Sequence, residues 1–269
     1  MEYLYMRKQK DSWDSSESYE VFMGRWSKLI ASKFLKWLNP PINLSWLDLG
    51  CGTGALSKAI YSCCQPKSVT GIDPSAEFLI KAKEKISNKA EFIVGTSTNI
   101  PKENETFDKV ISGLALNFFQ DIDNSFSEMK RVIKKKGEIA AYVWDYSDRM
   151  DFLRLFWDAA KRIDPESQNL DEGVRFPICI IINLKKTFQN ADLSDIETTY
   201  LDIDTIFSNF EDFWKPFLGG QGPAPSYLHS LSEALQNKIK AKIRERITFE
   251  SDGSIKLLAR AIAIRGRYK

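Results

Sequence analysis

A glycine-rich stretch near residue 50 carries the residues whose types and spacing point most directly to chemistry. It follows the apolar run 46–49, which has the character of a buried strand, and precedes a helical pattern that begins at Ala55. Its glycines are Gly50, Gly52 and Gly54. Glycines at this spacing let a chain turn sharply out of a strand and bring its N–H groups close to a ligand. The helix start adds aligned amide dipoles, so the stretch predicts a ligand-binding turn.

Two aspartates restrict the ligand that this turn could hold. Asp48 lies two residues before the first glycine, and Asp73 ends the next predicted strand. A carboxylate as close to the turn as Asp48 repels phosphates and tolerates a cation such as a sulfonium or an ammonium group. Asp73 can accept hydrogen bonds from both hydroxyls of a ribose. Residues 50–55 also fit a dinucleotide fingerprint, so the residues alone leave two adenosine-containing ligands open.

The elements that must position these residues alternate between strands and helices. Strands are predicted at 46–49, 68–73, 91–94, 108–112, 138–144, 194–203 and 255–267. Helical patterns separate the first five, which indicates an α/β, Rossmann-like, doubly wound and mainly parallel seven-stranded sheet. The last strand alternates along its length and is predicted to be antiparallel.

The remaining segments are predicted to cover the ligand edge of that sheet. Helices over 13–38, broken near Gly24, would lie above the ligand, and a helical cap would come from 149–190 and 204–252. The Gly/Pro stretch 219–225 is predicted to be irregular. We therefore expect residues 1–269 to form a single domain.

Composition narrows the classes of partner and compartment. The chain of 269 residues has a net charge of +2, which gives no reason to expect a nucleic acid. Its four cysteines form no CxxC pair, so neither a metal site nor a disulfide framework is predicted. The chain shows no signal-peptide pattern and no apolar run of ~20 residues. These features predict a cytoplasmic protein without a membrane partner.

Three motifs resemble class I S-adenosylmethionine-dependent methyltransferases. They are Leu47–Gly54, Gly71–Ser75, and Arg131–Ile133 with Gly137. Further segments resemble one bacterial subgroup of that family: Tyr19, Met23–Ser27, Val143–Tyr146, Phe156–Ala160 and Pro216–Pro223. The resemblance implies S-adenosylmethionine as cofactor and S-adenosylhomocysteine as product.

The resemblance also implies which residues bind the cofactor. The set is Asp48, Gly50, Cys51, Gly52, Gly54, Asp73, Pro74, Ser75, Thr96, Ser97, Leu114, Tyr19 and Arg25. The glycines would line the methionine portion, Asp73 the ribose, and Tyr19 and Arg25 would close over the cofactor. Thr96 stands where the family often has an aspartate for the adenine amino group. Arg25 is equally well explained by a surface ion pair.

A substrate pocket is predicted from polar and aromatic residues near the same edge. Its candidates are Asn117, Trp144, Tyr146, Trp157, Trp214, Phe217 and Gln221. Aromatic residues at such places are as often core filling. Asp145 and Tyr146 are candidates for a polar catalytic role, although Asp145 could equally cap a helix beginning near Ser147.

The predicted function is methyl transfer from S-adenosylmethionine to a small-molecule acceptor by in-line displacement. A reactive sulfonium needs mainly alignment and exclusion of water, so no catalytic triad is expected. The alternatives are an NAD-dependent oxidoreductase on the same turn, a non-catalytic cofactor-binding regulator, and methylation of a macromolecule.

Overall fold

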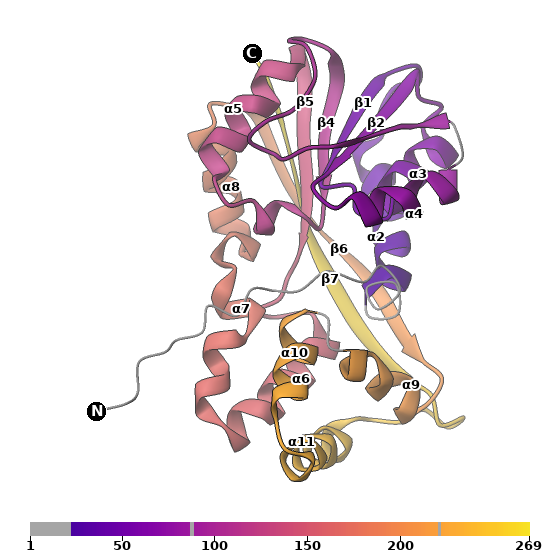
Figure 1. Cartoon of the computed structure of the whole chain (residues 1–269), viewed down its shortest axis with the longest axis vertical. Helices are drawn as coiled ribbons and strands as arrows, with labels where there is room; N and C mark the ends of the chain where they lie inside the picture. The colour runs from indigo at the N-terminus through magenta and orange to yellow at the C-terminus, as the bar shows by residue number, and fades with distance from the viewer. Residues whose placement is uncertain (1–22, 87–88, 220–221) are drawn as a thin grey trace.

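A seven-stranded sheet forms the centre of the computed structural model, which describes residues 23–86, 89–219 and 222–269 (Figure 1). The strand order is β3-β2-β1-β4-β5-β7-β6. The strands are β1 (Ser45–Leu49), β2 (Ser68–Asp73), β3 (Glu91–Val94), β4 (Phe107–Gly113), β5 (Ile133–Trp144), β6 (Ser194–Phe207) and β7 (Ile255–Arg267). Only β7 runs antiparallel to its neighbours, β5 and β6. The predicted fold class is confirmed.

Helices cover both faces of this sheet. They are α2 (Arg25–Leu38), α3 (Ala55–Cys63), α4 (Ala76–Ile86), α5 (Ile122–Val132) and α8 (Ile181–Asn190). Figure 1 shows α2, α3 and α4 on one side of the sheet and α5 and α8 on the other. In α2, Trp26, Ile30 and Phe34 recur every four residues, so one buried face packs against α3 and β6.

A helical cap lies beyond the carboxyl ends of the parallel strands (Figure 1). It contains α6 (Asp151–Ile163), α7 (Glu172–Arg175), α9 (Phe210–Trp214), α10 (Pro223–Ser230) and α11 (Glu233–Arg246). Residues 261–267 of β7 pair with both β5 and β6, whereas residues 255–260 pair with β6 and form a single bridge from Ala259 to Met150. The two longest strands, β6 and β7, therefore extend together beyond the other strands, and the cap packs at this extension.

Stacked aromatic rings fill the interior of the cap. Phe152 and Phe156 lie one turn apart on α6, and their ring centroids are 4.4 and 4.7 Å from that of Phe217. Phe207 from β6 and Phe213 from α9 complete the cluster. One continuous set of buried apolar side chains runs from this cluster into the sheet. Sheet and cap therefore share a core.

The structure moves several predicted boundaries, including the start of β5, which was predicted at 138 and lies at Ile133. α8 packs against β6 and β7, so residues 181–190 belong to the sheet's helical layer although the cap was predicted to run from 149 to 190. Residues 204–207 extend β6 and do not begin the second cap segment. α10 starts within the Gly/Pro stretch, because Pro223 at the first helical position needs no N–H donor.

No helix within the described ranges has the length and apolar character needed to span a membrane.

Candidate functional site

The glycine turn joins three neighbouring strands. The N–H groups of Gly50 and Cys51 both donate to the Ile72 carbonyl of β2, over 2.8 and 3.1 Å. Gly50 has a φ of +74°, and a Cβ at this position would lie 2.5 Å from the Cβ of Ala115, just after β4. Only glycine fits this conformation and this close approach. The turn is therefore held where β1, β2 and β4 end.

Asp73 connects the end of β2 to the turn. Its Oδ2 accepts a hydrogen bond from the Gly52 N–H and its Oδ1 one from the Ser75 N–H, each over 2.9 Å. Burial raises the pKa of this carboxyl, and the two N–H donors oppose that shift. Each oxygen retains acceptor capacity for a ligand.

Asp48 is the more deeply buried carboxylate of the site. The Ser57 hydroxyl donates to its Oδ2 over 2.6 Å, while Oδ1 is buried and receives no hydrogen bond from the described residues. Burial raises the pKa of Asp48 to about 7, against the opposing hydrogen bond from Ser57. A buried acceptor without a partner is costly, so a donor or a cation nearby would stabilise it.

These residues border a cavity of about 430 Å³ along the carboxyl edge of the sheet. The walls come from the ends of five strands and from the start of α2. The lining residues predicted from sequence are Asp48, Gly50, Cys51, Gly52, Asp73, Pro74, Ser75, Thr96, Ser97, Leu114, Trp144 and Tyr146. The structure thus brings most of the predicted site into one place.

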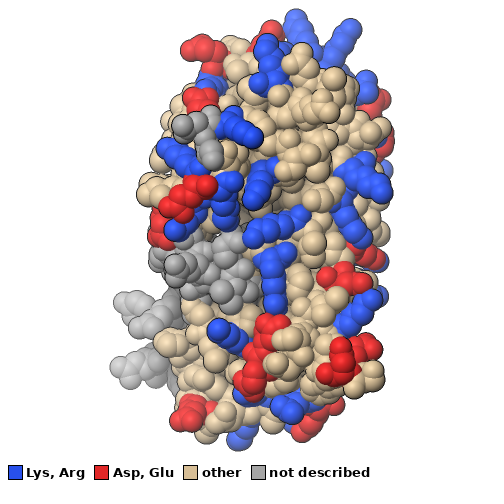
Figure 2. Space-filling model, turned by 90° about the vertical axis from the view of Figure 1, so that its right-hand side faces the viewer, with Lys and Arg blue, Asp and Glu red and all other residues tan. Residues whose placement is uncertain are grey.

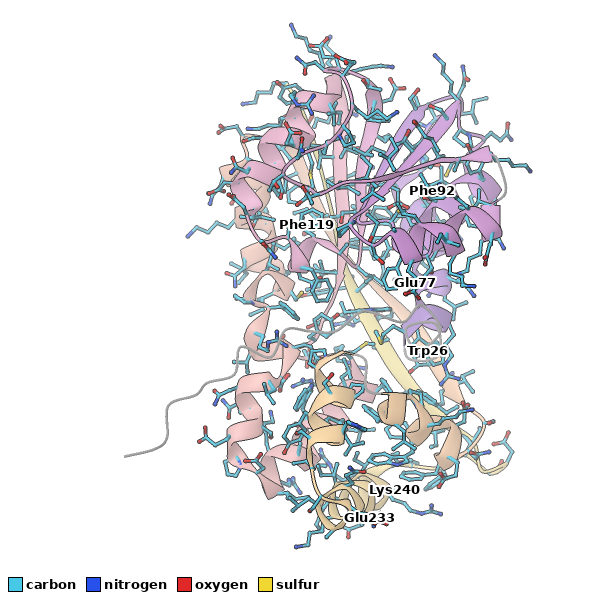
Figure 3. All side chains as sticks on the ribbon, in the orientation of Figure 1. Trp26, Glu77, Phe92, Phe119, Glu233 and Lys240 are labelled. Carbon is cyan, nitrogen blue, oxygen red and sulfur yellow. The ribbon has the colours of Figure 1, made fainter. Side chains whose placement is uncertain are left out.

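Gly54 and Arg25 lie away from this cavity. A Cβ on Gly54 would lie 3.0 Å from Ala82 of α4, so Gly54 lets α3 start close to α4. The Arg25 guanidinium lies 4.3 Å from the Trp26 ring and 4.5 Å from the Phe207 ring, and pairs with Asp212 of α9 over 3.2 Å. Arg25 therefore joins α2 to the cap, near the Trp26 side chain labelled in Figure 3.

Three predicted pocket aromatics are core residues of the cap. Trp157 and Phe217 are fully buried, and Trp214 is 4% exposed. The Trp157 indole N–H donates to Glu172, and Phe217 belongs to the stacked rings on α6. These side chains support the cap and do not line the cavity.

Of the two polar candidates, Tyr146 lines the cavity, whereas Asp145, like the pocket candidate Asn117, does not. Asp145 accepts from the Ser147 hydroxyl and the Asp148 N–H, both at 3.3 Å, and burial raises its pKa. It forms a local turn, because α6 starts only at Asp151. Asn117 borders a separate hollow between α8 and the 3-10 helix Leu116–Phe118. Tyr19 and Gln221 lie outside the described residues.

Sequence reasoning missed several residues of the cavity wall. They are Met23, Ser27, Phe78, Phe118, Phe119 and Gln120, with Tyr142 on β5. Phe119, labelled in Figure 3, lies at the end of the sheet that faces the cap. Spacing offered a signal in two places: Met23 and Ser27 are one helical turn apart, and Tyr142 is two residues before Trp144.

Residues 47–141 match the family of methyltransferase domains. A demethylmenaquinone methyltransferase of Thermotoga maritima is 30% identical over 115 residues, which are 43% of this chain and 48% of that protein. An uncharacterised methyltransferase of Geobacillus sp. is 29% identical over 118 residues, 43% of this chain and 54% of that protein. The chain thus spans about half the length of these curated relatives.

Solved structures share the fold over most of the chain. The YcgJ protein of Bacillus subtilis aligns with a TM-score of 0.57 at 17% identity, over 90% of this chain and 98% of that one. A phosphoethanolamine N-methyltransferase of Haemonchus contortus, solved with S-adenosyl-L-methionine, aligns with a TM-score of 0.58 at 15% identity. The alignment covers 94% of this chain and 56% of that one. Residues 47–141 thus match a methyltransferase domain, and the likeness of the whole chain to these solved structures is one of fold.

Proposed function

We propose that the chain is a methyltransferase that moves a methyl group from S-adenosylmethionine to a small-molecule acceptor. The observation that carries this proposal is Asp73, which is bonded to the glycine turn and faces the cavity beside it. A carboxylate there matches the ribose hydroxyls of an adenosine ligand. Asp48, with a buried oxygen that lacks a donor, suits a ligand with positive charge.

The residues present fit the parts of this cofactor. Asp73 would hold the ribose, Thr96 and Ser97 would lie beside the adenine, and the turn would hold the methionine portion. When bound, S-adenosylmethionine would supply an electrophilic methyl carbon attached to a sulfonium leaving group. The aromatic side chains of β5 would exclude water and align the acceptor.

The alternatives have less support. A dinucleotide would bring phosphates close to Asp48, and the family match is to methyltransferase domains. The small-molecule acceptor rests on the cavity of about 430 Å³ beside the glycine turn, since the relatives are matched over about half their length. The cytoplasmic location, the lack of a nucleic-acid partner and the single-domain boundaries stay predictions.

Calorimetric titration with S-adenosylmethionine and with NAD tests the proposal directly. We expect binding of S-adenosylmethionine, and Asp73→Ala should weaken it by about 1.5–3 kcal/mol, or roughly 10- to 150-fold, through lost charge-assisted hydrogen bonds. Asp123→Ala, at an exposed position of α5, is the matched control and should bind as the unmodified protein does. Tight binding of NAD alone, or unchanged affinity in Asp73→Ala, would contradict the proposal.

A further inference from the structure

The cavity extends beyond the part that the cofactor would fill. In the strand order β3-β2-β1-β4-β5, the glycine turn, Asp73 and Thr96 occupy the ends of the first three strands. Neighbouring strands are roughly 5 Å apart, so the end of β5 lies roughly 10 Å from that of β1. The space at β4 and β5 is therefore available to the acceptor; this step rests on the proposed function.

Three aromatic side chains form the wall of that space at β5. Tyr142, Trp144 and Tyr146 alternate along the chain, are 2%, 1% and 7% exposed, and all line the cavity. Side chains two residues apart on a strand share one face of the sheet. Tyr142 and Trp144 therefore share one face of β5, and Tyr146 follows two residues beyond the end of the strand.

A second set of rings connects the cavity wall to the cap. The centroid of the Phe118 ring is 5.1 Å from that of Phe176, which lies just after α7 in the cap. The Phe176 ring is in turn 6.0 Å from that of Tyr146. Phe118 is 37% exposed, so its ring lies where the cavity meets the surface. A ligand at β5 would thus meet Phe118 and Tyr146, and both of these rings contact Phe176 of the cap.

Charge is distributed unevenly along the cavity. Among the described residues that line it, Asp48 and Asp73 are the charged ones, and both lie at the cofactor end. Charged side chains of both signs are instead spread over the outer surface, as Figure 2 shows for one face. A charged acceptor would lose its hydration at β5 without gaining a counter-ion there, whereas a flat ring would gain aromatic contacts.

We propose that the acceptor is an uncharged aromatic compound whose ring packs against Trp144, Tyr146 and Phe118. Trp144 and Tyr146 provide the stacking surface, and Phe118, whose ring contacts Phe176 of the cap, borders it. Discrimination against saturated rings comes from their poorer fit between flat aromatic walls. Discrimination against charged rings comes from desolvation.

Three probes of similar size separate these contributions. We would titrate the protein at pH 7, with and without saturating S-adenosylhomocysteine, with 2-naphthol (flat and neutral), decahydro-2-naphthol (neutral and saturated) and 2-naphthoate (flat and charged). Equilibrium dialysis would give each dissociation constant. In the presence of S-adenosylhomocysteine, 2-naphthol should bind at least tenfold more tightly than either of the other two.

Two variants locate the binding. Phe118→Leu, at a partly exposed position, and Tyr146→Leu should each weaken 2-naphthol binding at least fivefold and leave S-adenosylhomocysteine affinity within twofold. Phe249→Leu, a 40% exposed residue that does not line the cavity, is the matched control and should change neither.

The outcomes distinguish this inference from the proposed function. Failure of S-adenosylhomocysteine to bind would overturn the proposed function. The relative dissociation constants of the three probes would still test the aromatic wall of the cavity. Equal or tighter binding of 2-naphthoate or decahydro-2-naphthol, no binding of 2-naphthol, or unchanged 2-naphthol binding in both variants would overturn the aromatic acceptor.

Discussion

Two buried carboxylates, one beside the cavity and one in the cap, share a similar pKa and differ in their surroundings. Asp48 is 1% exposed and Glu172 is 3% exposed, and burial raises the pKa of each to about 7. Glu172 accepts a hydrogen bond from the Trp157 indole and lies next to the pair formed by Asp171 and Arg154. Asp48, at the wall of a cavity, accepts from the Ser57 hydroxyl, and its buried Oδ1 receives no hydrogen bond from the described residues.

The comparison shows that a raised pKa does not by itself identify a ligand site. Both shifts have the same main cause, which is desolvation. Adjacent space and an unsatisfied acceptor distinguish Asp48, whereas Glu172 is enclosed by side chains of the cap. We therefore expect changes at the cap to alter stability and changes at the turn to alter ligand binding.

The largest effect is expected at Asp171, where the cap depends on a buried ion pair. The Asp171 side chain is 1% exposed, and it accepts from the Arg154 guanidinium and from the Gly173 N–H. Asp171→Ala should lower the free energy of unfolding by about 3 kcal/mol, because Arg154 loses its partner. Urea unfolding measures this loss.

Asp158→Ala is the matched control for that experiment. Asp158 also pairs with basic residues of the cap, but its side chain is 39% exposed, so its removal should cost less than about 1 kcal/mol. Cofactor affinity should be unchanged in both variants. A tenfold loss of affinity in Asp171→Ala would show that the cap contributes to cofactor binding as well as to stability.

An intermediate effect is expected from the titration of Asp48. Its pKa of about 7 in the cofactor-free protein is above the ordinary 3.8, so the carboxyl is partly protonated at pH 6.5. A nearby cation favours the ionised form, so binding should release protons, and affinity should rise with pH up to about 7. Calorimetry at pH 6.5 in two buffers of different ionisation enthalpy measures the protons released.

Two amide variants assign that proton to one carboxyl. Asp48→Asn should reduce proton release, and the remainder then reports the cofactor's own titration. Glu172→Gln should leave proton release unchanged, although the pKa of Glu172 is also about 7. Equal proton release in the unmodified protein and in Asp48→Asn would remove Asp48 from the binding site.

The smallest effect is expected at Arg25, which joins the start of α2 to the cap. Its side chain and that of Asp212 are 33% and 34% exposed. Arg25→Ala should therefore lower stability by up to about 1 kcal/mol and leave cofactor affinity within twofold. Thermal unfolding measures the stability, and calorimetry measures the cofactor affinity. A tenfold loss of affinity would indicate that Arg25 contributes to the cofactor site.

Local patterns predicted the parts of the fold that depend on neighbours in the chain. The alternation in 255–267 predicted β7 with the limits that it has in the structure, and the glycine spacing predicted the turn after β1. Prediction was less accurate where tertiary packing determines the limits of an element, as in the extension of β6 to Phe207. There β6 continues because it still pairs with β7 beyond the part of β7 that pairs with β5.

The sequence by itself determined the turn, the strand rhythm and the two aspartates at strand ends. Glycine conformations, side-chain periodicity and a carboxylate beside backbone N–H groups all act over a few residues. Only the tertiary structure decided which aromatic side chains line the cavity and which fill the cap. Arg25 illustrates the reason, because its partner Asp212 lies 187 positions away along the chain. A long side chain takes the partner that folding brings near, and local sequence does not encode that choice.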